Sequence, residues 1–576
     1  MEKDSVTGTV YTLAAKCRDC YRCLKVCPVK AIRMKDGQAY VDPQRCIACG
    51  TCIRECPQRA KVYTQSLHEA KKIIDSGVPA AASLAPSFAA FYPGWKTRRI
   101  ASALRRLGFC RVAETSEAAA ESAQESTRLF NARPGAASVC TACPAVVNYV
   151  EKYKPQMAGA LLPAASPMIT HARRLKAEGP PETRVIFIGP CVAKKQEAGR
   201  PEYEGIVDCV LTFEELDSWF EEERVRLEEC EESAPDGKAA GYSGYFPLPG
   251  GLFMTAGIET VTGGTRHMHV SGAAEVIAAI DYCVRAPAVL EPLFCVHGCI
   301  NGPGAGESVN VFERRQGLAD YAAGAAAVPQ NKQQGRMAAR EEYCASPVIT
   351  AAHAEEEINA VLLQTGKSPE TGLMNCGACG YDSCREKAAA VLDGMAEVEM
   401  CLPYMRMLAE QRTDIIIETS PNGIVLLDEH LKVIKMNPAF KKYFAADDTR
   451  LGGDISVIMD PACFEKLAAG TGDSIEAAAG SAAGGYSLHG LYYALRQYRQ
   501  YVGIFVDVTL LRQDREKLED IKQKTACQAK AMLDEQVKMS QQIAWQLGEN
   551  MARTEALVKK LAVLAGEEGG DAGKNR

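Results

Sequence analysis

Residues 189–197 read GPCVAKKQE, and the cysteine in this stretch belongs to a set of four on which the interpretation of the chain depends. The four are far apart in sequence: Cys143, Cys191, Cys295 and Cys299. Scattered thiols of this kind can bind one metal cluster only if a folded domain brings three separate segments together. Around them, residues 67–345 alternate apolar runs with helical patterns, which predicts an α/β domain.

The composition excludes some functions and favours others. At 576 residues the chain is too long for one core, and 47% hydrophobic with 24% charged residues is typical of soluble globular proteins. A net charge of −6 gives no reason to expect nucleic-acid binding, which calls for a basic face. In a reducing compartment, 24 cysteines indicate metal binding and not disulfides.

Two observations predict that this compartment is the cytoplasm. Residues 1–6 lack the basic start and apolar run of a signal peptide. The uncharged stretch 77–95 is nearly long enough to span a bilayer, but it contains Pro79, Pro86 and Pro93 and mostly small residues. We therefore expect a buried strand and loop there, and no membrane span.

Two cysteine runs near the N-terminus share the spacing C-x2-C-x2-C-x3-C-P. This is the pattern of bacterial two-cluster ferredoxins, in which the fourth cysteine of each run binds the other cluster. One [4Fe–4S] cluster is then expected on Cys17, Cys20, Cys23 and Cys56, and a second on Cys46, Cys49, Cys52 and Cys27. A pair of zinc sites fits the doubled spacing poorly.

A third set has the spacing C-x2-C-x4-C-x16-C and consists of Cys376, Cys379, Cys384 and Cys401. The spacing suits one further [4Fe–4S] cluster and resembles the single-cluster domain of Rnf-type electron-transfer subunits and corrinoid iron–sulfur proteins. Four thiolates alone are also compatible with a structural zinc ion. The iron–sulfur neighbours favour the cluster.

The scattered set resembles the three motifs of [FeFe]-hydrogenases, in family order and over about residues 80–315. The matching segments are TACP at 141–144, PCVAKKQE at 190–197, and Glu291 followed by Cys295 and Cys299 with the spacing E-x3-C-x3-C. The resemblance implies an H-cluster, which is a [4Fe–4S] subcluster joined to a two-iron subsite that carries CO, cyanide and a dithiolate bridge.

The resemblance also implies roles for individual residues. Cys143, Cys191, Cys295 and Cys299 would be the ligands, with Cys299 bridging to the two-iron subsite. The ammonium group of Lys194 would donate to one cyanide. Pro86 and Ser87, in SLAPS, match the A-P-[AS] segment that packs near the other cyanide.

Three positions depart from the family pattern. Ala142 stands where the family has a cysteine that carries protons to the bridging amine, and alanine has no proton to give. Gly189 and Leu293 replace methionines that line the pocket, which changes packing and not ligands. Cys140 is a candidate substitute relay, although a buried hydrophobic role is the more usual one for a free cysteine.

The C-terminal part resembles a sensory module. Residues 415–444 resemble the opening of a PAS domain, with Asn437 in a strand-to-helix turn, and the match resumes at 501–509. There Asp507 belongs to a D-x-T sequence that ends many PAS domains and starts a signalling helix; an aspartate in this place can also simply cap the helix. The PAS domain could bind a ligand or dimerise without one.

Residues 512–566 contain no proline and predict a long helix. Leu511, Leu518, Thr525, Met532 and Met539 recur every seven residues, which indicates an imperfect coiled-coil seam and a homodimer. No kinase, phosphatase or DNA-binding motif follows, so a downstream signalling protein is the expected output partner.

The expected fold class is therefore multidomain, α/β with α+β. In chain order we expect a two-cluster ferredoxin-like domain at 1–66, an H-cluster domain at 67–345, a single-cluster domain at 346–408, a PAS domain at 409–511, a coiled-coil helix at 512–566 and a disordered tail at 567–576. The cofactors would be three accessory [4Fe–4S] clusters and the H-cluster.

These features predict a sensory [FeFe]-hydrogenase-like protein, a low-activity oxidoreductase that reports hydrogen or redox state through its PAS domain and helix. Its partners would be hydrogen and protons, an electron carrier such as ferredoxin, and the proteins that mature the H-cluster. One alternative is a catalytic, ferredoxin-linked hydrogenase. Another is an iron–sulfur scaffold or redox sensor without the two-iron subsite, as in cytosolic iron–sulfur assembly proteins, although Lys194 would then have little purpose.

Overall fold

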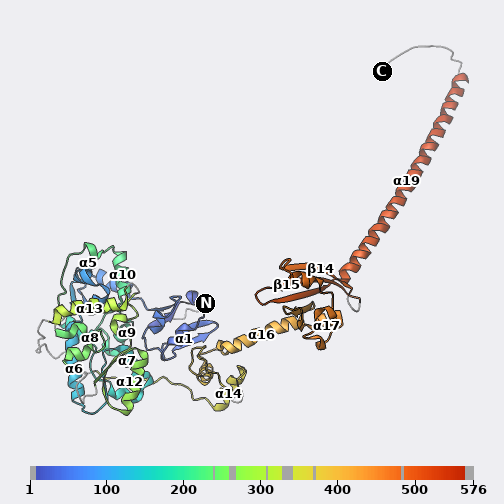
Figure 1. The fold of residues 1–576 in the computed structure, drawn as a ribbon. Coiled ribbons are helices and arrows are strands. Elements are labelled where there is room, and N and C mark those ends of the chain that lie inside the picture. The colour runs from blue at the N-terminus through green and yellow to red at the C-terminus, as the bar shows by residue number, and fades with distance from the viewer. Residues whose placement is uncertain are drawn as a thin grey trace. The chain divides into compact units, whose positions relative to one another are not determined.

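The computed structural model describes residues 8–237, 241–258, 267–306, 309–326, 341–367, 372–481 and 485–564. The chain divides into two compact units, residues 1–405 and 406–576. Figure 1 shows the elements of both. Among the described residues, no helix is both long and apolar enough to cross a membrane. The expected tail at 567–576 lies outside the described residues.

The N-terminal part of the first unit consists of two short sheets and two one-turn helices. Strand β1 (Val10–Thr12) pairs antiparallel with β4 (Lys61–Tyr63), and β2 (Ile32–Lys35) forms a hairpin with β3 (Gln38–Val41). The helices are the equivalent segments of the two cysteine runs, α1 (Arg22–Val26) and α2 (Thr51–Arg54). The repeated sequence pattern therefore gives a repeated structure.

The following region contains two parallel sheets. The first has the order β6 (Arg111–Glu114), β5 (Ala80–Leu84), β8 (Arg184–Ile188), β9 (Cys209–Leu211). The second has the order β10 (His267–Ser271), β11 (Val289–Leu293), β7 (Ser138–Val139). The prediction of an α/β fold is confirmed, and the uncharged stretch 77–95 contains the buried strand β5 followed by a short helix.

Helices connect these strands and cover them. They are α3 (Leu67–Asp75), α5 (Ile100–Arg106), α6 (Ser116–Asn131), α7 (Pro144–Tyr153), α8 (Pro167–Glu178), α9 (Ala193–Ala198), α10 (Phe213–Glu222), α11 (Gly251–Ala256), α12 (Ala273–Arg285) and α13 (Val311–Ala326). Strands β5 and β8 are almost entirely buried, because parallel strands with helices on their faces have no solvent side.

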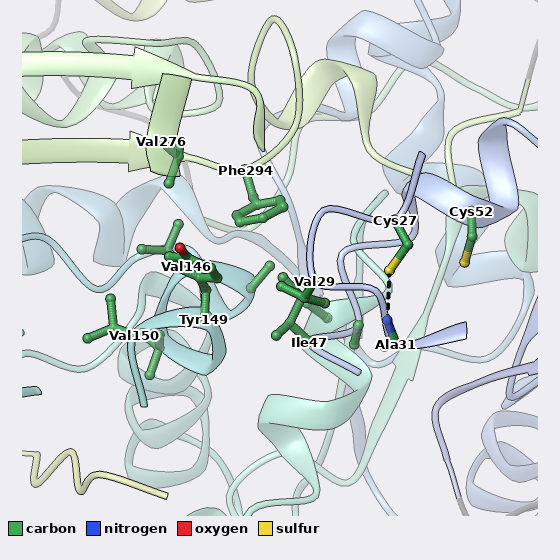
Figure 2. Close-up of a cluster of buried hydrophobic side chains, with 14 of the residues drawn as sticks. Cys27, Val29, Ala31, Ile47, Cys52, Val146, Tyr149, Val150, Val276 and Phe294 are labelled. Carbon is green, nitrogen blue, oxygen red and sulfur yellow. Dashed lines mark hydrogen bonds between the residues drawn. The ribbon is translucent and has the colours of Figure 1, made fainter. Parts of the chain in front are cut away.

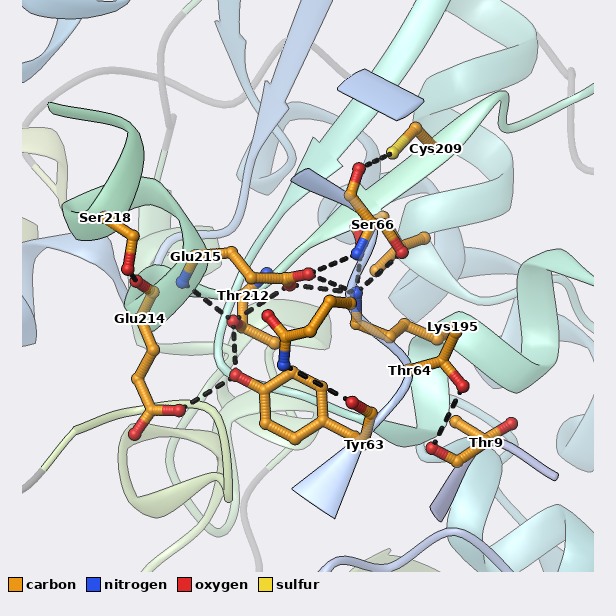
Figure 3. A network of polar contacts seen from close by, with 12 residues as sticks. Thr9, Tyr63, Thr64, Ser66, Lys195, Cys209, Thr212, Glu214, Glu215 and Ser218 are labelled. Atoms are coloured by element: carbon orange, nitrogen blue, oxygen red, sulfur yellow. Dashed lines mark hydrogen bonds and ion pairs between the residues drawn. The ribbon is translucent and has the colours of Figure 1, made fainter. Parts of the chain in front are cut away.

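Apolar and polar contacts attach the N-terminal part to this region. Figure 2 shows Val29 and Ile47 of the cysteine-rich part beside Val146 and Tyr149 of α7, in one continuous core. Figure 3 shows the second joint, where the hydroxyl of Tyr63 lies 2.8 Å from Thr212 Oγ1 and donates to Glu214 Oε2 at 2.8 Å. The core at the first joint includes Cys27 and Cys52 of the candidate sites.

The last part of the first unit is a helix pair, α14 (Glu355–Gln364) and α15 (Cys384–Leu392). It contacts the N-terminal part through main-chain and side-chain bonds. Lys30 Nζ donates to the carbonyl of Gly380 at 2.7 Å, and the amide of Met34 donates to Met395 O at 2.9 Å. An ion pair of 3.0 Å joins Arg45 to Asp393.

The second unit contains one antiparallel sheet with the order β13 (Val433–Met436), β12 (Gly423–Leu427), β16 (Gln500–Asp507), β15 (Ser487–Leu495), β14 (Ser474–Ser481). Helices α17 (Pro438–Phe444) and α18 (Ala462–Ala468) accompany it. Asn437 is fully buried and caps α17, since its Oδ1 accepts from Phe440 N at 2.9 Å and from Ile424 N at 2.7 Å. The predicted strand-to-helix turn is confirmed.

Two helices flank this sheet in the chain. Helix α16 (Leu402–Thr419) precedes it, and α19 (Thr509–Leu564) follows it. The hydroxyl-rich turn before α19 is closed by Asp507, whose Oδ1 accepts from Thr509 N at 2.9 Å. The long helix is confirmed, and its apolar residues, such as Leu518 and Met532, are exposed at 52% and 71%.

Candidate functional site

Three parallel strands deliver the four scattered cysteines. Cys143 follows β7, Cys191 follows β8, and Cys295 and Cys299 follow β11, in each case at the carboxyl end of the strand. Ligands of open parallel sheets bind outside this edge. The two sheets therefore bring together three segments that are far apart in the sequence.

The electrostatics of the four thiols report their proximity. Burial raises the pKa of Cys191 to about 11, and Cys143 raises it further while Lys194 opposes the shift. The pKa of Cys299 is also raised, first by burial and then by Cys191 and Cys143. The pKa of Cys295 is raised by the same causes, first by burial and then by Cys191 and Cys143. The thiolate is the form of cysteine that binds a metal, and four thiols at one place are the usual donor set of an iron–sulfur cluster.

Lys194 is buried beside these thiols, at 8% exposure. Its Nζ donates to Glu197 Oε2 at 2.6 Å, to Ser166 Oγ at 2.9 Å and to the carbonyl of Ala142 at 3.5 Å. These bonds hold an ammonium group at the residue that precedes Cys143. A buried cation next to the cysteines is what an anionic ligand of the site would require.

Other sequence-selected positions lie around the same place. Pro86 and Ser87 are buried in the turn between β5 and the following helix. Ala142 is half-buried. Cys140 is 1% exposed and packs in an apolar cluster with Leu162 and Phe253, which favours the hydrophobic role over a relay.

The two methionine replacements have a steric explanation. A Cβ atom on Gly189 would lie 2.8 Å from Ala85 Cβ and 3.0 Å from Phe187 Cε1, so the buried Phe187 ring fills the space that a side chain at 189 would need. Leu293 Cδ1 would lie 3.2 Å from a Cβ on Gly298. The pocket is thus repacked and not left open.

The segment that carries Cys295 and Cys299 is fixed by a buried carboxylate. Glu291, on β11, accepts from the amides of Leu252 at 2.9 Å and Phe253 at 3.0 Å, which open α11. Burial raises the pKa of Glu291 to about 7. Glu291 therefore has a structural role in the motif. It joins α11 to β11, the strand that leads to Cys295 and Cys299.

Gly298 gives the first test of this loop. It has φ +81°, and a Cβ there would lie 2.3 Å from the carbonyl oxygen of Pro247, which already accepts from Cys299 N at 2.8 Å. Gly298→Ala should displace Cys299 and remove the iron of one cluster from the purified protein. Gly77→Ala is the matched control, because Gly77 has φ +73° with nothing within 4 Å. It should lose only about 1–3 kcal/mol of stability and no iron; equal iron loss in both variants would contradict the prediction.

One of the two predicted ferredoxin sets lines a common hollow. Cys27, Cys46, Cys49 and Cys52 line one small hollow, the grouping that the crossed assignment of the fourth cysteine predicts. Cys27 Sγ accepts from Ala31 N at 3.3 Å, as Figure 2 shows. The pKa of Cys49 is raised by burial, and Cys143 contributes to that shift. This set is therefore adjacent to the scattered set.

The other predicted sets are also brought together. The pKa of Cys23 is raised by burial, with contributions from Cys17 and Cys56, as the crossed assignment requires; Cys20 is exposed. Cys376, Cys379, Cys384 and Cys401 line one small hollow. Among the described residues, no three Cys, His, Asp or Glu are gathered as ligands of a single ion.

Reasoning from the sequence did not predict the polar joint in Figure 3. Lys195, the neighbour of Lys194, is buried and pairs with Glu215 at 2.8 Å. It also donates to Ser66 Oγ at 2.9 Å and Val210 O at 2.7 Å. Its partners are distant in sequence, so no local pattern could reveal them. The joint anchors the segment between the cysteine-rich part and the sheets to α9.

Comparison with known families agrees with these sites. Residues 9–57 match the family model "4Fe-4S dicluster domain", residues 78–303 match "Iron only hydrogenase large subunit, C-terminal domain", residues 374–403 match "Putative Fe-S cluster", and residues 411–476 match "PAS domain". The chain is thus a hydrogenase-like iron–sulfur protein with a PAS domain, and the coarse resemblance predicted from the sequence is confirmed.

Individual relatives cover only parts of the chain. The cytosolic Fe-S cluster assembly factor NAR1 of Vanderwaltozyma polyspora is 36% identical over 107 residues, which are 18% of this chain and 20% of the relative. Iron hydrogenase 1 of Clostridium pasteurianum is 28% identical over 178 residues, which are 28% of this chain and 31% of the relative. The NADP-reducing hydrogenase subunit HndD of Solidesulfovibrio fructosivorans is 28% identical over 276 residues, which are 43% of this chain and 44% of the relative. The chain therefore spans less than half of each of these relatives.

Proposed function

We propose that the protein is a sensor of hydrogen or redox state built on a hydrogenase-like site with low turnover. The observation that carries the proposal is the combination of a buried Lys194 beside four converging cysteines with alanine at position 142. The binding residues are kept, whereas the side chain that would move a proton is missing. A sensor depends on the occupancy of its states, and only fast turnover depends on fast proton delivery.

The residues divide the work as follows. Cys143, Cys191, Cys295 and Cys299 would hold the four-iron part, with Cys299 bridging to the two-iron subsite. When bound, the two-iron group would supply reversible activation of hydrogen. Lys194 would donate to an anionic ligand of that group, while its bond to Glu197 fixes the direction of the ammonium.

The accessory sites offer a route for electrons. The set of Cys27, Cys46, Cys49 and Cys52 lies next to Cys143, as the effect of Cys143 on the pKa of Cys49 indicates. The set of Cys17, Cys20, Cys23 and Cys56 includes the exposed Cys20, where an electron carrier such as ferredoxin could dock. The relay would therefore run from the H-cluster site through the N-terminal part.

The output would pass through the second unit. Its sheet packs around aromatic rings in mutual contact, such as Phe464 with Tyr492 at 5.0 Å and Tyr492 with Phe505 at 5.6 Å, which favours a PAS domain without a ligand. The exposed apolar residues of α19 favour a second copy of the chain as the partner of this helix. A downstream signalling protein would bind this dimer and respond to its state.

Two other functions compete with sensing. A catalytic hydrogenase would share the same ligands and differ in turnover. An assembly scaffold is favoured by the similarity to NAR1, which is the most identical of the three relatives above. Lys194 argues against a scaffold, since its ammonium lies beside the residue before Cys143, where the resemblance implies a cyanide ligand.

Loading the purified protein with a synthetic two-iron precursor, followed by infrared spectroscopy, tests the proposal. We expect CO and cyanide bands that shift under hydrogen, together with very low hydrogen turnover. If the bands are absent, the result favours an assembly scaffold. If the bands are present and turnover is high, the result favours a catalytic hydrogenase. A Cys299→Ala protein treated in the same way is the control for precursor bound elsewhere, and it should show no bands.

A further inference from the structure

Two buried lysines line the hollow of the third cysteine set. Lys367 and Lys387 have exposures of 7% and 3%, and both stand in its wall. Lys367 Nζ donates to Cys401 Sγ at 2.8 Å. Lys387 Nζ donates to the carbonyl of Val398 at 2.8 Å. The hollow, its four cysteines and an ammonium already bonded to one sulfur together fit an anionic iron–sulfur cluster.

The bond from Lys367 differs in kind from those at the ferredoxin-type sets. The sulfur atoms there accept neutral backbone amides, from Ala31 to Cys27, from Ala48 to Cys46 and from Ala60 to Cys56, each at 3.3 Å. An ammonium group donates a stronger, charge-assisted hydrogen bond than an amide does. The third set therefore has the stronger donor at its sulfur.

Lysines near the ferredoxin-type sets point to oxygen atoms. Lys61 Nζ donates to the carbonyl of Ala39 at 3.0 Å, and Lys152 Nζ donates to the carbonyl of Cys46 at 2.7 Å. Their charges are thus partly balanced by main-chain dipoles, whereas the charge of Lys367 lies on a ligand sulfur. The difference favours reduction of the third cluster over the other two.

The electrostatic consequence follows from the charge of the reduced state. Each added electron makes a cluster more negative, and hydrogen bonds to its sulfurs and nearby positive charge stabilise that state. Burial strengthens the effect, because the surroundings screen it less than water does. We propose that the cluster on Cys376, Cys379, Cys384 and Cys401 is the electron sink of this chain, and that Lys367 holds its reduction potential above those of the two ferredoxin-type clusters.

The position of the third set suits a sink that is read by the second unit. The loop of Gly380 lies against the N-terminal part, where Lys30 Nζ donates to the Gly380 carbonyl at 2.7 Å. Burial raises the pKa of the neighbouring Tyr381, and Cys379 and Cys27 both add to that shift. Electrons can therefore arrive from the ferredoxin-type sets. Helix α16 begins at Leu402, the residue after Cys401, and ends at Thr419, shortly before strand β12 in the chain.

The experiment is a redox titration of the full-length protein followed by EPR, with mediators and no hydrogen. A Cys401→Ala chain identifies the signal of the third cluster by its loss. In the unaltered protein this signal should have the most positive midpoint of the three accessory clusters. Lys367→Met should lower its affinity for an electron at least tenfold, about 59 mV for a one-electron couple, and leave the other two midpoints unchanged.

Two variants complete the design. Lys367→Arg keeps the positive charge, so the midpoint potential of the third cluster should stay close to that of the unaltered protein. Arg385→Met removes an exposed charge that pairs with Glu355 and should leave the midpoint unchanged. A third cluster with a midpoint below the other two, or an unchanged midpoint in Lys367→Met, would overturn the proposal. If Lys367→Met fails to bind iron, the order of midpoints in the unaltered chain decides. The measurement does not need the two-iron group, so it stands apart from the test of hydrogen sensing.

Discussion

Ala142→Cys is expected to raise hydrogen turnover of the loaded protein by about 10²–10⁴-fold, the usual contribution of a positioned proton donor. Position 142 directly precedes Cys143, and its carbonyl lies 3.5 Å from Lys194 Nζ. A thiol there would start beside the residues that we propose to hold the two-iron group. Turnover is measured with a reduced viologen and normalised to the infrared intensity of the loaded site.

Two variants separate a restored relay from a general improvement of the site. Ala142→Ser should raise turnover less, since a hydroxyl gives up its proton less readily than a thiol. Cys140→Ala should change nothing, because Cys140 is fully buried in an apolar cluster. A loaded Ala142→Cys protein with unchanged turnover would contradict the prediction and move the bottleneck to Gly189, Leu293 or the remaining relay.

The grouping of the closely spaced cysteines could be predicted from the sequence because short spacings are themselves structural constraints. The two ferredoxin runs fix their own loops, and the hollow around Cys27 and Cys46 has the crossed composition that the doubled spacing predicts. Asn437 and the D-x-T turn at Asp507 are equally local, and both form the caps expected of them. For each of these features the informative neighbours lie within a few residues.

Long-range packing could not be predicted in this way. The sequence marks Gly189 as a departure, but only the fold reveals that Phe187 and Ala85 occupy the space beside it. Lys367 lies 34 residues from the cysteine to which it donates, and nothing in its neighbours distinguishes it from a surface lysine. Pairings of this kind depend on how helices and strands assemble, and a single sequence contains no record of it.

The second large effect is expected for Lys194→Met, which should abolish the CO and cyanide bands and also destabilise the protein. Lys194 and Glu197 form a buried ion pair of 2.6 Å, with exposures of 8% and 5%. Removing the lysine leaves a buried carboxylate without its partner, which typically costs about 3–5 kcal/mol. Chemical denaturation measures the stability, and infrared spectroscopy of the loaded protein measures the site.

The adjacent lysine supplies a matched control. Lys195 lies on the same helix and forms an ion pair of 2.8 Å with Glu215 that is at least as buried. Lys195→Met should therefore destabilise the protein by a similar amount and keep the bands. Adding Glu197→Gln to Lys194→Met should restore much of the stability without restoring the bands, because the orphaned charge is gone and the donor is still missing. Bands that persist in Lys194→Met would mean that this ammonium does not contact the two-iron group, and bands that disappear in both lysine variants would mean that loading depends on stability alone.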